Sequence, residues 1–371
     1  MKKICILQNS LTYGGTDTFV INLCKGLVRD GYDVTAILSV DKAQDLPREK
    51  ELADTGCRII KTCYLGSIKS KLKHLKLLYK ELKKGKYDVF QSNIDLFNGP
   101  QMLAAWLAGV PIRECHSHNS QQGKELSQGR TLSIKFYQKI MRWLCWTFSN
   151  RRVGCSEIAM NFLFGERWKD DAYSKVIHNG IDLLVYKKQF DTEKKKKELG
   201  LTAKFNICTV GRMSLQKNSL FIVEIMKVLS KIRNDCDLVW VGTGEMEEDI
   251  KNTIRKYCIG NRVHLLGSRT DISEIMRSCD AFLLPSLFEG LAIVLIEAQA
   301  AGLQCVISNT TSSESNFGGC LYLPLEENAE YWAKKISNIL DGNIKNNIDE
   351  SILEKYSLEY MVSKMEEVFE S

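Results

Sequence analysis

The sequence lacks several features that would assign it to other classes of protein. No apolar run approaches the roughly 18 residues of a membrane-spanning helix; the longest, Met102 to Val110, is followed closely by Pro111 and Arg113. The 13 cysteines include no Cys-x-x-Cys pair, which argues against a zinc ribbon or a disulfide framework. The first predicted strand begins at Lys3, which leaves no room for a signal peptide. We expect a cytoplasmic protein.

Nucleic-acid-binding patterns are also missing, although the charge is uneven. There is no helix-turn-helix, RNP-type aromatic pattern or zinc knuckle. Residues 1–190 carry 30 Lys and Arg against 18 Asp and Glu, whereas residues 191–371 carry 21 against 27. This asymmetry predicts that the first half faces a polyanion or an anionic membrane surface. Because no nucleic-acid motif is present, we expect the first half to bind the inner face of the cell membrane and not nucleic acid.

The length and the periodic pattern indicate two domains. A chain of 371 residues with 44% hydrophobic content is sufficient for two cores. Strand-like runs alternate with helical patterns from Lys3 to Ser156 and again from Phe205 to Ser308. This predicts an α/β fold of two Rossmann-like, doubly wound parallel-sheet domains. We expect an N-terminal domain over 1–180 and a C-terminal domain over 181–352.

Two glutamates flank a predicted strand-to-helix turn in the second half. Glu289 lies in the turn, and Glu297 lies on a helix that is apolar on almost every face, where an unpartnered charge would cost several kcal/mol. The free helix N-terminus is a natural anion site, formed by the backbone N–H groups of Gly290, Leu291 and Ala292. The arrangement suggests a phosphate with hydroxyls on either side. A salt bridge from Glu297 to a basic neighbour is the alternative.

Cations occupy another predicted turn of the same half. Gly211, Arg212 and Lys217 follow the strand Phe205–Val210, where the two cations could reach a diphosphate at the carboxyl end of the sheet. Two solvated loop cations are the alternative. Because the two glutamates lie in the same half, we favour a site.

In their order along the chain, these motifs resemble the retaining GT-B glycosyltransferases of family 4. Glu289 and Glu297, separated by seven residues, are similar to the family signature. Further matches are Gly14-Gly15, Asn179-Gly180, Gly211-Arg212 with Lys217, Gly242-Thr243-Gly244 and Val263 to Gly267. The resemblance implies a GT-B fold whose domains face an interdomain cleft, with the final helix, 353–371, packing back on the first domain.

The resemblance also implies roles for the matching residues. Arg212 and Lys217 would offset charge on the departing nucleoside diphosphate, Glu289 would hold donor-sugar hydroxyls, and Glu297 would hold the ribose. Gly15 would let the backbone approach the donor. The implied donor-binding set is Gly15, Gly211, Arg212, Lys217, Gly267, Arg269, Glu289, Gly290, Leu291, Ala292, Ile293 and Glu297.

Two histidines end a predicted strand of the first half. Alternation places His116 and His118 on one face, but no third ligand has the spacing of a zinc site. The resemblance implies a histidine near the sugar, and Asn119 makes His118 the closer match. It thus implies a catalytic set of His118, Arg212, Lys217 and Glu289, with His116 and Asn119 as acceptor-side candidates.

Two further patterns are typical of metal or cofactor sites. Asp235-Cys236-Asp237 has the Asp-x-Asp spacing of Mn²⁺ sites, but it precedes a strand at the end of the sheet away from the expected site, so we interpret it as a solvated turn. Gly242-Thr243-Gly244 lacks the third glycine of a dinucleotide motif, which disfavours a nicotinamide oxidoreductase. We expect no cofactor and a metal-independent reaction.

A lysine-rich amphipathic helix is predicted over 68–84. Residues 69–86 contain eight lysines and one acidic residue, and helical spacing relates Ile68, Leu72, Leu75, Tyr79 and Leu82. One interpretation is a packed helix with a solvated lysine face; the other is docking of 68–86 on anionic lipid. Aromatic anchoring could come from a second cluster, which could equally be core: Arg142, Trp143, Trp146 and Phe148.

The combined prediction is a retaining, metal-independent hexosyltransferase that uses a nucleotide-diphosphate sugar, with UDP as the expected nucleotide. The pattern that includes His116-Ser117-His118-Asn119 resembles the branch associated with capsule and exopolysaccharide assembly, which implies a polyprenyl-diphosphate-linked acceptor. Another GT-B activity, such as a nucleotide-sugar epimerase or a phosphorylase, and a non-catalytic membrane-surface binding module are the alternatives.

Overall fold

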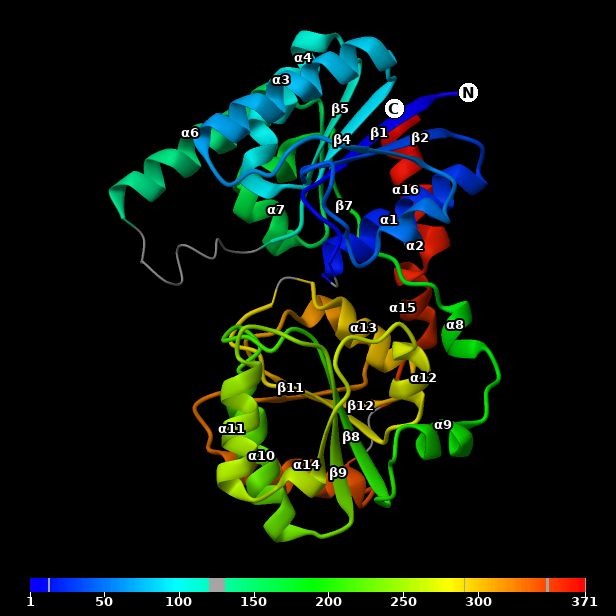
Figure 1. Ribbon diagram of the computed structural model, residues 1–371, viewed down its shortest axis with the longest axis vertical. Helices are drawn as coiled ribbons and strands as arrows, with labels where there is room; N and C mark the ends of the chain where they lie inside the picture. Colours follow the sequence, from blue (N-terminus) through cyan, green and yellow to red (C-terminus); the bar gives the residue numbers. More distant parts are fainter. Residues whose placement is uncertain (13, 120–130, 290, 345–346, 371) are drawn as a thin grey trace. The chain divides into compact units, whose positions relative to one another are not determined.

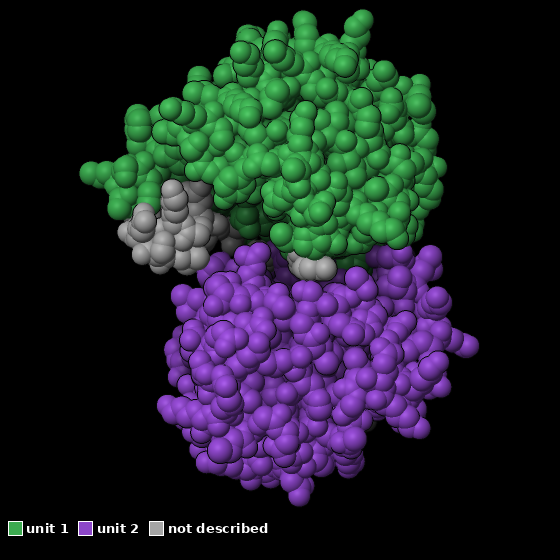
Figure 2. All heavy atoms as spheres, in the orientation of Figure 1, with its two compact units in different colours: residues 1–181, 355–371 green, residues 182–354 purple. Residues whose placement is uncertain are grey.

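A computed structural model of the protein describes residues 1–371 except 13, 120–130, 290, 345–346 and 371 (Figure 1). The chain forms two compact units, coloured separately in Figure 2. Unit 1 comprises Met1–Ile181 and Lys355–Ser371, and unit 2 comprises Asp182–Glu354. Each unit contains one parallel sheet, so the predicted α/β fold with two Rossmann-like domains is confirmed.

The sheet of unit 1 has seven parallel strands in the order β3-β2-β1-β4-β5-β6-β7. The strands are β1 (Lys3–Gln8), β2 (Asp33–Leu38), β3 (Arg58–Lys61), β4 (Val89–Ser92), β5 (Ile112–Ser117), β6 (Arg151–Gly154) and β7 (Ser174–Val176). The helices are α1 (Gly15–Arg29), α2 (Glu49–Ala53), α3 (Ile68–Gly85), α4 (Asn98–Ala108), α6 (Leu132–Phe148), α7 (Glu157–Phe164) and α16 (Leu358–Glu370). Short 3₁₀ turns are η1 (Asp95–Phe97), η2 (Glu166–Asp170) and η5 (Glu354–Tyr356).

Two cores form in unit 1 because its strands are buried on both faces, as parallel strands usually are. One core joins the sheet to α1 and α16, and the other joins it to α3, α4 and α7. The contact between α1 and α16 is close: a Cβ on Gly26 would lie 2.3 Å from a methyl carbon of Val362. The C-terminal helix therefore belongs to the core of unit 1.

The sheet of unit 2 has six parallel strands in the order β10-β9-β8-β11-β12-β13. The strands are β8 (Phe205–Val210), β9 (Cys236–Val241), β10 (Val263–Leu265), β11 (Ala281–Leu284), β12 (Gln304–Ser308) and β13 (Cys320–Leu323). The helices are α8 (Leu184–Lys187), α9 (Thr192–Glu198), α10 (Ser219–Ile232), α11 (Glu247–Tyr257), α12 (Ile272–Arg277), α13 (Ile293–Ala300), α14 (Ala329–Leu340) and α15 (Glu350–Leu353). The 3₁₀ turns are η3 (Gly260–Arg262) and η4 (Ser313–Ser315).

The main core of unit 2 lies between its sheet and the helices α10, α11 and α14 (Figure 1). Trp240 of β9 and Trp332 of α14 are among its largest fully buried side chains. Over the ranges described above, no helix combines the length and the apolar character needed to cross a bilayer.

Candidate functional site

The order of strands in unit 2 reverses between β8 and β11, which are hydrogen-bonded neighbours. Ligands of doubly wound sheets bind outside the carboxyl ends of the strands at such a switch point. The loops that follow these two strands are joined: the backbone N–H of Leu287 donates to the carbonyl of Gln216 at 2.8 Å, and Gln216 Nε2 donates to the carbonyl of Phe288 at 3.2 Å. The predicted turns after β8 and β11 therefore lie together at the carboxyl edge of the sheet of unit 2.

Lys217 and Glu289 meet at this edge. Lys217 Nζ donates to Glu289 Oε1 at 2.6 Å, and the two side chains are 18% and 7% exposed. Charge-assisted hydrogen bonds of this length are among the stronger ones in proteins. The structure thus brings together two of the predicted catalytic residues. A phosphate bound here could compete with Glu289 for the ammonium group of Lys217.

Arg212 adds a second cation to the loop after β8. Its side chain is exposed, and it makes no hydrogen bond or ion pair with another residue that the structure describes. Because guanidinium groups bind phosphates with two parallel hydrogen bonds, Arg212 is available for an anionic ligand at this edge.

The N-terminus of α13 lies directly after the loop that carries Glu289. Ala292 occupies the N-cap position, and its side chain makes no capping hydrogen bond to the helix. Leu291, Ala292 and Ile293 are buried, whereas Gly290 lies outside the described residues. The hydroxyl of Ser286, in the same loop, is buried and has no hydrogen-bond partner in the part of the chain described.

Glu297 has a partner that the sequence analysis missed. The hydroxyl of Tyr186, from α8, donates to the Glu297 carboxylate. Burial first, and then the negative charges of Glu297 and Asp182, raise the pKa of Tyr186 well above its usual value. The buried phenol therefore stays neutral and serves as a hydrogen-bond donor to Glu297.

The glycines at this edge allow three loops to pack backbone against backbone. Gly242 has φ +128°, and a Cβ there would lie 2.1 Å from the carbonyl oxygen of Gly211. The N–H of Gly242 donates to the carbonyl of Gly267 at 2.8 Å, and the N–H of Gly211 donates to that of Val241 at 3.0 Å. The Gly242-Thr243-Gly244 pattern thus allows close packing of the loop after β9.

Arg269 is held by carboxylates. Its guanidinium makes a bidentate contact with Asp271, at 2.8 and 2.7 Å, and reaches Glu198 at 3.3 Å. The same Asp271 binds Lys195 of α9 at 2.9 Å, and these cations lower the pKa of Asp271. This predicted donor-binding residue therefore belongs to an ion-pair network between α9 and the loop after β10.

In unit 1, His116 and His118 stack at the end of β5, with ring centroids 4.4 Å apart. Asn93 Nδ2 donates to the carbonyl of Leu7 at 3.1 Å, so its Oδ1 faces His118 Nε2 at 2.9 Å and can only accept. Nε2 therefore carries the hydrogen and Nδ1 carries the lone pair. Burial, and then His116, hold the pKa of His118 well below 6.5, so the ring is neutral.

Beneath the histidines, β5 carries Glu114, which is fully buried and was missed in the sequence analysis. Its Oε1 lies 3.2 Å from Nδ1 of His116. Burial raises the pKa of Glu114 well above 4.5 and lowers that of His116 to about 3. The contact is therefore one between a neutral acid and a neutral imidazole, since desolvation of two charges outweighs their attraction.

Asp17 organises the loop that contains Gly14, at the start of α1. One carboxylate oxygen accepts from the N–H and the hydroxyl of Thr12, both at 2.8 Å, and from the N–H of Gly14 at 3.2 Å; the other accepts from Gln8 at 2.7 Å. Gly15, the predicted donor-approach residue, is the exposed first residue of α1. The loop conformation thus depends on a buried side chain that glycine spacing did not reveal.

The remaining acceptor-side candidate, Asn119, directly follows His118. Its side-chain amide donates to Asp95, and the same carboxylate accepts from the N–H of His118 at 3.2 Å. The turn after β5 is therefore fixed by Asp95.

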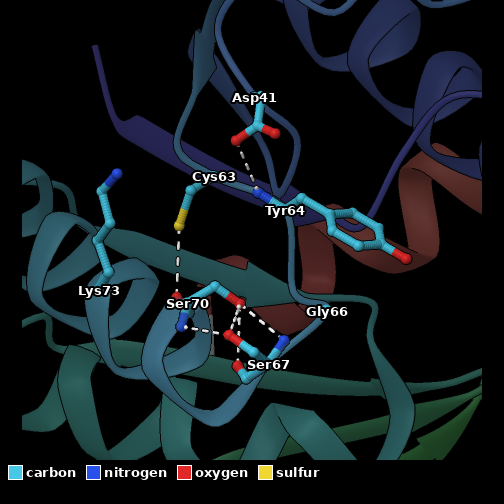
Figure 3. Close-up of a pocket in the computed structure, with 7 residues that line it drawn as sticks. All are labelled: Asp41, Cys63, Tyr64, Gly66, Ser67, Ser70 and Lys73. Atoms are coloured by element: carbon cyan, nitrogen blue, oxygen red, sulfur yellow. Dashed lines mark hydrogen bonds between the residues drawn. The ribbon is translucent and has the colours of Figure 1, made fainter.

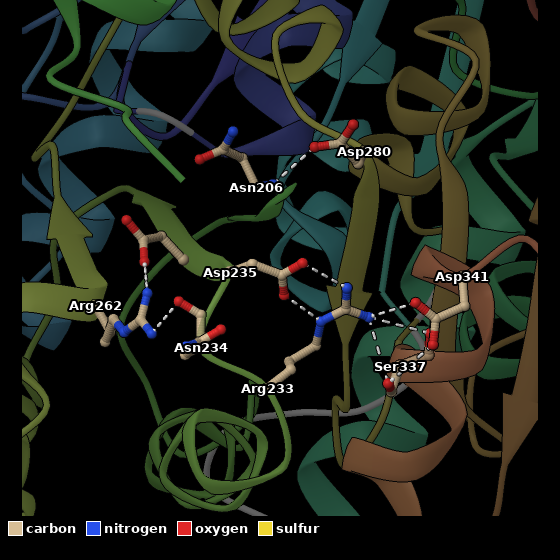
Figure 4. A network of polar contacts seen from close by, with 9 residues as sticks. Asn206, Arg233, Asn234, Asp235, Arg262, Asp280, Ser337 and Asp341 are labelled. Carbon is tan, nitrogen blue, oxygen red and sulfur yellow. Dashed lines mark hydrogen bonds and ion pairs between the residues drawn. The ribbon is translucent and has the colours of Figure 1, made fainter. Parts of the chain in front are cut away.

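The Asp235-Cys236-Asp237 segment lies at the amino end of β9, and both of its carboxylates have partners; Figure 4 shows Asp235 beside Arg233. Arg233 binds Asp235 at 2.7 Å, while Arg262 and His264 bind Asp237 at 3.2 and 3.0 Å. The interpretation of a solvated turn is wrong for Asp237, which is buried beside the Arg262 guanidinium and the His264 imidazole. Within the ranges the structure describes, no group of three His, Cys, Asp or Glu side chains is arranged to hold a metal ion.

A hollow of about 340 Å³ opens in unit 1 at the start of α3 (Figure 3). None of the predicted site residues contributes to it; its lining residues are Asp41, Cys63, Tyr64, Gly66, Ser67, Ser70 and Lys73. Ser67 caps α3 by accepting from the N–H of Ser70 at 3.1 Å. The hydroxyls therefore stabilise the helix start.

The basic helix α3 packs through only part of the apolar face that its spacing indicated. Its buried residues are His74, Leu78 and Leu82, whereas Ile68, Leu72 and Tyr79 are exposed. In the second cluster, Trp143 is exposed, but Trp146 contacts the guanidinium groups of Arg152 and Arg167, which lie 4.1 and 3.8 Å from its ring centroid. Helical spacing alone did not distinguish the packed face from the exposed one.

Sequence and structure comparisons agree with this architecture. Residues 13–184 match the family described as Glycosyltransferase Family 4, and residues 191–351 match Glycosyl transferases group 1. EpsF of Bacillus subtilis, named as a glycosyltransferase, is 28% identical over 91% of this chain and 87% of its own length. The Escherichia coli UDP-Gal:alpha-D-GlcNAc-diphosphoundecaprenol alpha-1,3-galactosyltransferase is 31% identical over 77% of each chain. Anabaena HepE, solved with UDP and glucose, shares the fold with a TM-score of 0.83 over 100% of both chains at 18% identity.

Proposed function

Because the chain belongs to the group 1 glycosyltransferases of family 4, we propose that it transfers a hexose from a UDP-sugar to a polyprenyl-diphosphate-linked saccharide. The observation that carries the proposal is the Lys217–Glu289 pair at the switch point of unit 2, with exposed Arg212 in the same loop. Cations and a carboxylate at one sheet edge suit a ligand that joins a diphosphate to hydroxyls.

The proposed reaction retains the anomeric configuration and needs no metal ion. Lys217 and Arg212 bind the diphosphate and stabilise the negative charge that develops on it as the sugar departs. Glu289 holds sugar hydroxyls, and Glu297, positioned by Tyr186, accepts from the ribose. His118 is a proposed catalytic residue, and its neutral Nε2–H tautomer makes it a hydrogen-bonding group rather than a general acid.

The proposed acceptor and setting follow from the relatives. The Escherichia coli relative is named for a diphosphoundecaprenol-linked acceptor. We place this chain in capsule or exopolysaccharide assembly because CapH of Staphylococcus aureus, 25% identical over 64% of this chain, is named for capsular polysaccharide biosynthesis. Such an acceptor lies at a membrane surface. The lysines of α3 support docking of residues 68–86 on anionic lipid, because seven of the eight lysines in this segment are exposed.

Nucleotide-induced thermal stabilisation tests the donor site. The protein is heated with UDP, GDP, ADP or NAD, each in EDTA and in Mn²⁺, alongside Arg212→Ala and Glu297→Ala. A ligand that binds only the folded state adds about 2.7 kcal/mol of stability at a hundredfold excess over its dissociation constant. We expect a metal-independent shift with UDP that both variants lose.

Arg255→Ala, an exposed arginine on α11, is the matched control and should keep the full shift. No shift with any nucleotide would overturn the proposed donor site, and a shift with GDP or ADP instead would overturn the choice of UDP. An isomerised sugar or a sugar phosphate among the products would contradict transfer to an acceptor.

A further inference from the structure

Three helices form a layer of unit 1 with an unusually one-sided charge. Helix α4 contacts both α3 and α6 (Figure 1). Together the three helices carry ten Lys and Arg side chains, seven on α3 and three on α6, against one acidic residue, Glu81. This concentration accounts for most of the positive balance of the first half of the chain, and it predicts an anionic partner for this layer.

The same helices expose large apolar side chains in regular stripes. On α6, Leu132, Phe136, Ile140 and Trp143 recur at helical spacing and are between 38% and 85% exposed. On α3, Ile68, Leu72 and Tyr79 recur in the same way and are between 37% and 79% exposed. Monomeric soluble proteins seldom expose apolar side chains in such groups without a binding role.

Aromatic rings join the stripe of α6 to α4. Phe148 lies 5.4 Å from Trp106 of α4 and 6.2 Å from Trp143, measured between ring centroids. Both tryptophans are more than half exposed. Trp residues are suited to the boundary between water and lipid, because the indole is apolar over most of its surface and polar at one nitrogen.

We propose that the layer formed by α3, α4 and α6 docks on an anionic lipid bilayer, with the apolar stripe of α6 and Trp106 entering the interface and the lysines of α3 contacting phosphate headgroups. This inference rests on the proposed function, which places the acceptor in the membrane. It identifies α6 and α4 as the elements that insert, whereas α3 supplies the electrostatic attraction. Stable attachment of a peripheral protein generally takes both contributions.

A second copy of the chain is a poorer occupant. Pairing of this layer with itself would bring ten cations against ten others, with one carboxylate on each side. Like charges that face each other across an interface oppose association. The charge therefore favours a bilayer with anionic headgroups over a homodimer.

Vesicle flotation of the full chain tests the proposal. The vesicles contain phosphatidylcholine with 30 mol% phosphatidylglycerol, or phosphatidylcholine alone, and no acceptor. We expect Lys76→Ala with Lys80→Ala to weaken binding to the anionic vesicles at least tenfold, since each lysine near an anionic surface contributes about fivefold. We expect Phe136→Ser with Trp143→Ser to weaken it at least tenfold as well.

Matched double variants in unit 2 should bind as the unaltered protein does. Lys194→Ala with Lys197→Ala removes two exposed lysines of α9, and Leu184→Ser with Ile232→Ser removes two exposed apolar side chains. Lipids brominated near the headgroup should quench tryptophan fluorescence, and Trp143→Phe should reduce the quenching while vesicle binding persists. Nucleotide-induced stabilisation of each variant reports separately on the donor site, so failure of the docking surface and failure of the proposed function are distinguishable.

Several results would overturn the inference. One is equal binding to both kinds of vesicle, or none to either. Another is a loss of binding in the lysine pair but not in the Phe136 and Trp143 pair, which would exclude insertion of α6. A third is a dimer, detected by light scattering, that dissociates in Phe136→Ser with Trp143→Ser while vesicle binding is unchanged. That result would identify a second copy of the chain as the occupant of this surface.

Discussion

The Lys217–Glu289 pair should couple stability to the donor site. Replacing Lys217 by Met leaves a carboxylate that is 7% exposed without its cation. Removal of one partner from a fully buried pair costs about 3–5 kcal/mol, and the 18% exposure of Lys217 lets water offset part of that, so we expect about 2–3 kcal/mol. Urea unfolding of the ligand-free protein measures the loss. Nucleotide binding should fail in the same variant.

A double-mutant cycle separates the pair from its surroundings. Glu289→Gln keeps the shape of the side chain without the charge, so the double variant with Lys217→Met should recover about 1.5–3 kcal/mol relative to the sum of the single changes. Lys231→Met, an exposed lysine on α10, is the control and should change stability by no more than about 0.5 kcal/mol. Additive losses, with a coupling energy near zero, would refute the reasoning.

Three further predictions concern the loops and the buried polar groups. Gly242→Ala should lower the free energy of unfolding in urea by at least about 3 kcal/mol and abolish nucleotide binding, because its methyl would lie 2.1 Å from a backbone oxygen. Gly267→Ala, with φ +64° and open space around it, should cost about 1–2 kcal/mol, and equal costs would contradict the packing argument. Glu114→Gln should gain stability relative to the unaltered protein as pH rises above about 4.5, because the folded state keeps Glu114 protonated while the unfolded state ionises it. Urea unfolding at pH 5 and pH 8 measures the difference in stability between the two proteins, and the same difference at both pH values would be inconsistent with a raised pKa of Glu114. Asn93→Leu should release His118 from the Nε2–H tautomer, whereas Asn93→Asp should preserve that tautomer. Long-range ¹H–¹⁵N spectra report the tautomer, and the chain has only five histidines to assign; an unchanged tautomer in Asn93→Leu would show that another group fixes the ring.

The fold could be predicted from periodicity because both sheets are parallel and buried. The strand β8, for example, has the bounds Phe205–Val210 that its apolar pattern indicates. The short strands β7 and β13 could not be predicted, because runs of three and four mostly half-buried residues carry too little periodicity to distinguish them from loops. The two interpretations of α3 stayed open for a related reason: spacing shows that apolar residues share a face, but not that the face is packed.

The candidate site was predictable where a motif lay within one segment. The positions of Glu289 and Lys217 came from their turns, and the structure pairs them. The partner of Glu297, Tyr186, lies more than a hundred positions away along the chain, and nothing in its local sequence indicates the contact. Arg269 was predicted to bind the donor, but carboxylates bind its guanidinium instead: one from the neighbouring Asp271 and one from Glu198 of the distant α9. Long-range polar contacts of this kind depend on tertiary packing.

Direct transfer of sugar tests the central claim. The protein is incubated in EDTA with labelled UDP-sugars and an undecaprenyl-diphosphate-linked monosaccharide in detergent, and the product linkage is assigned by NMR. We expect acceptor-dependent release of UDP and a product with the anomeric configuration of the donor, both lost in Lys217→Met and Glu289→Gln. An inverted product, a strict requirement for a metal ion, or full activity in those variants would contradict it.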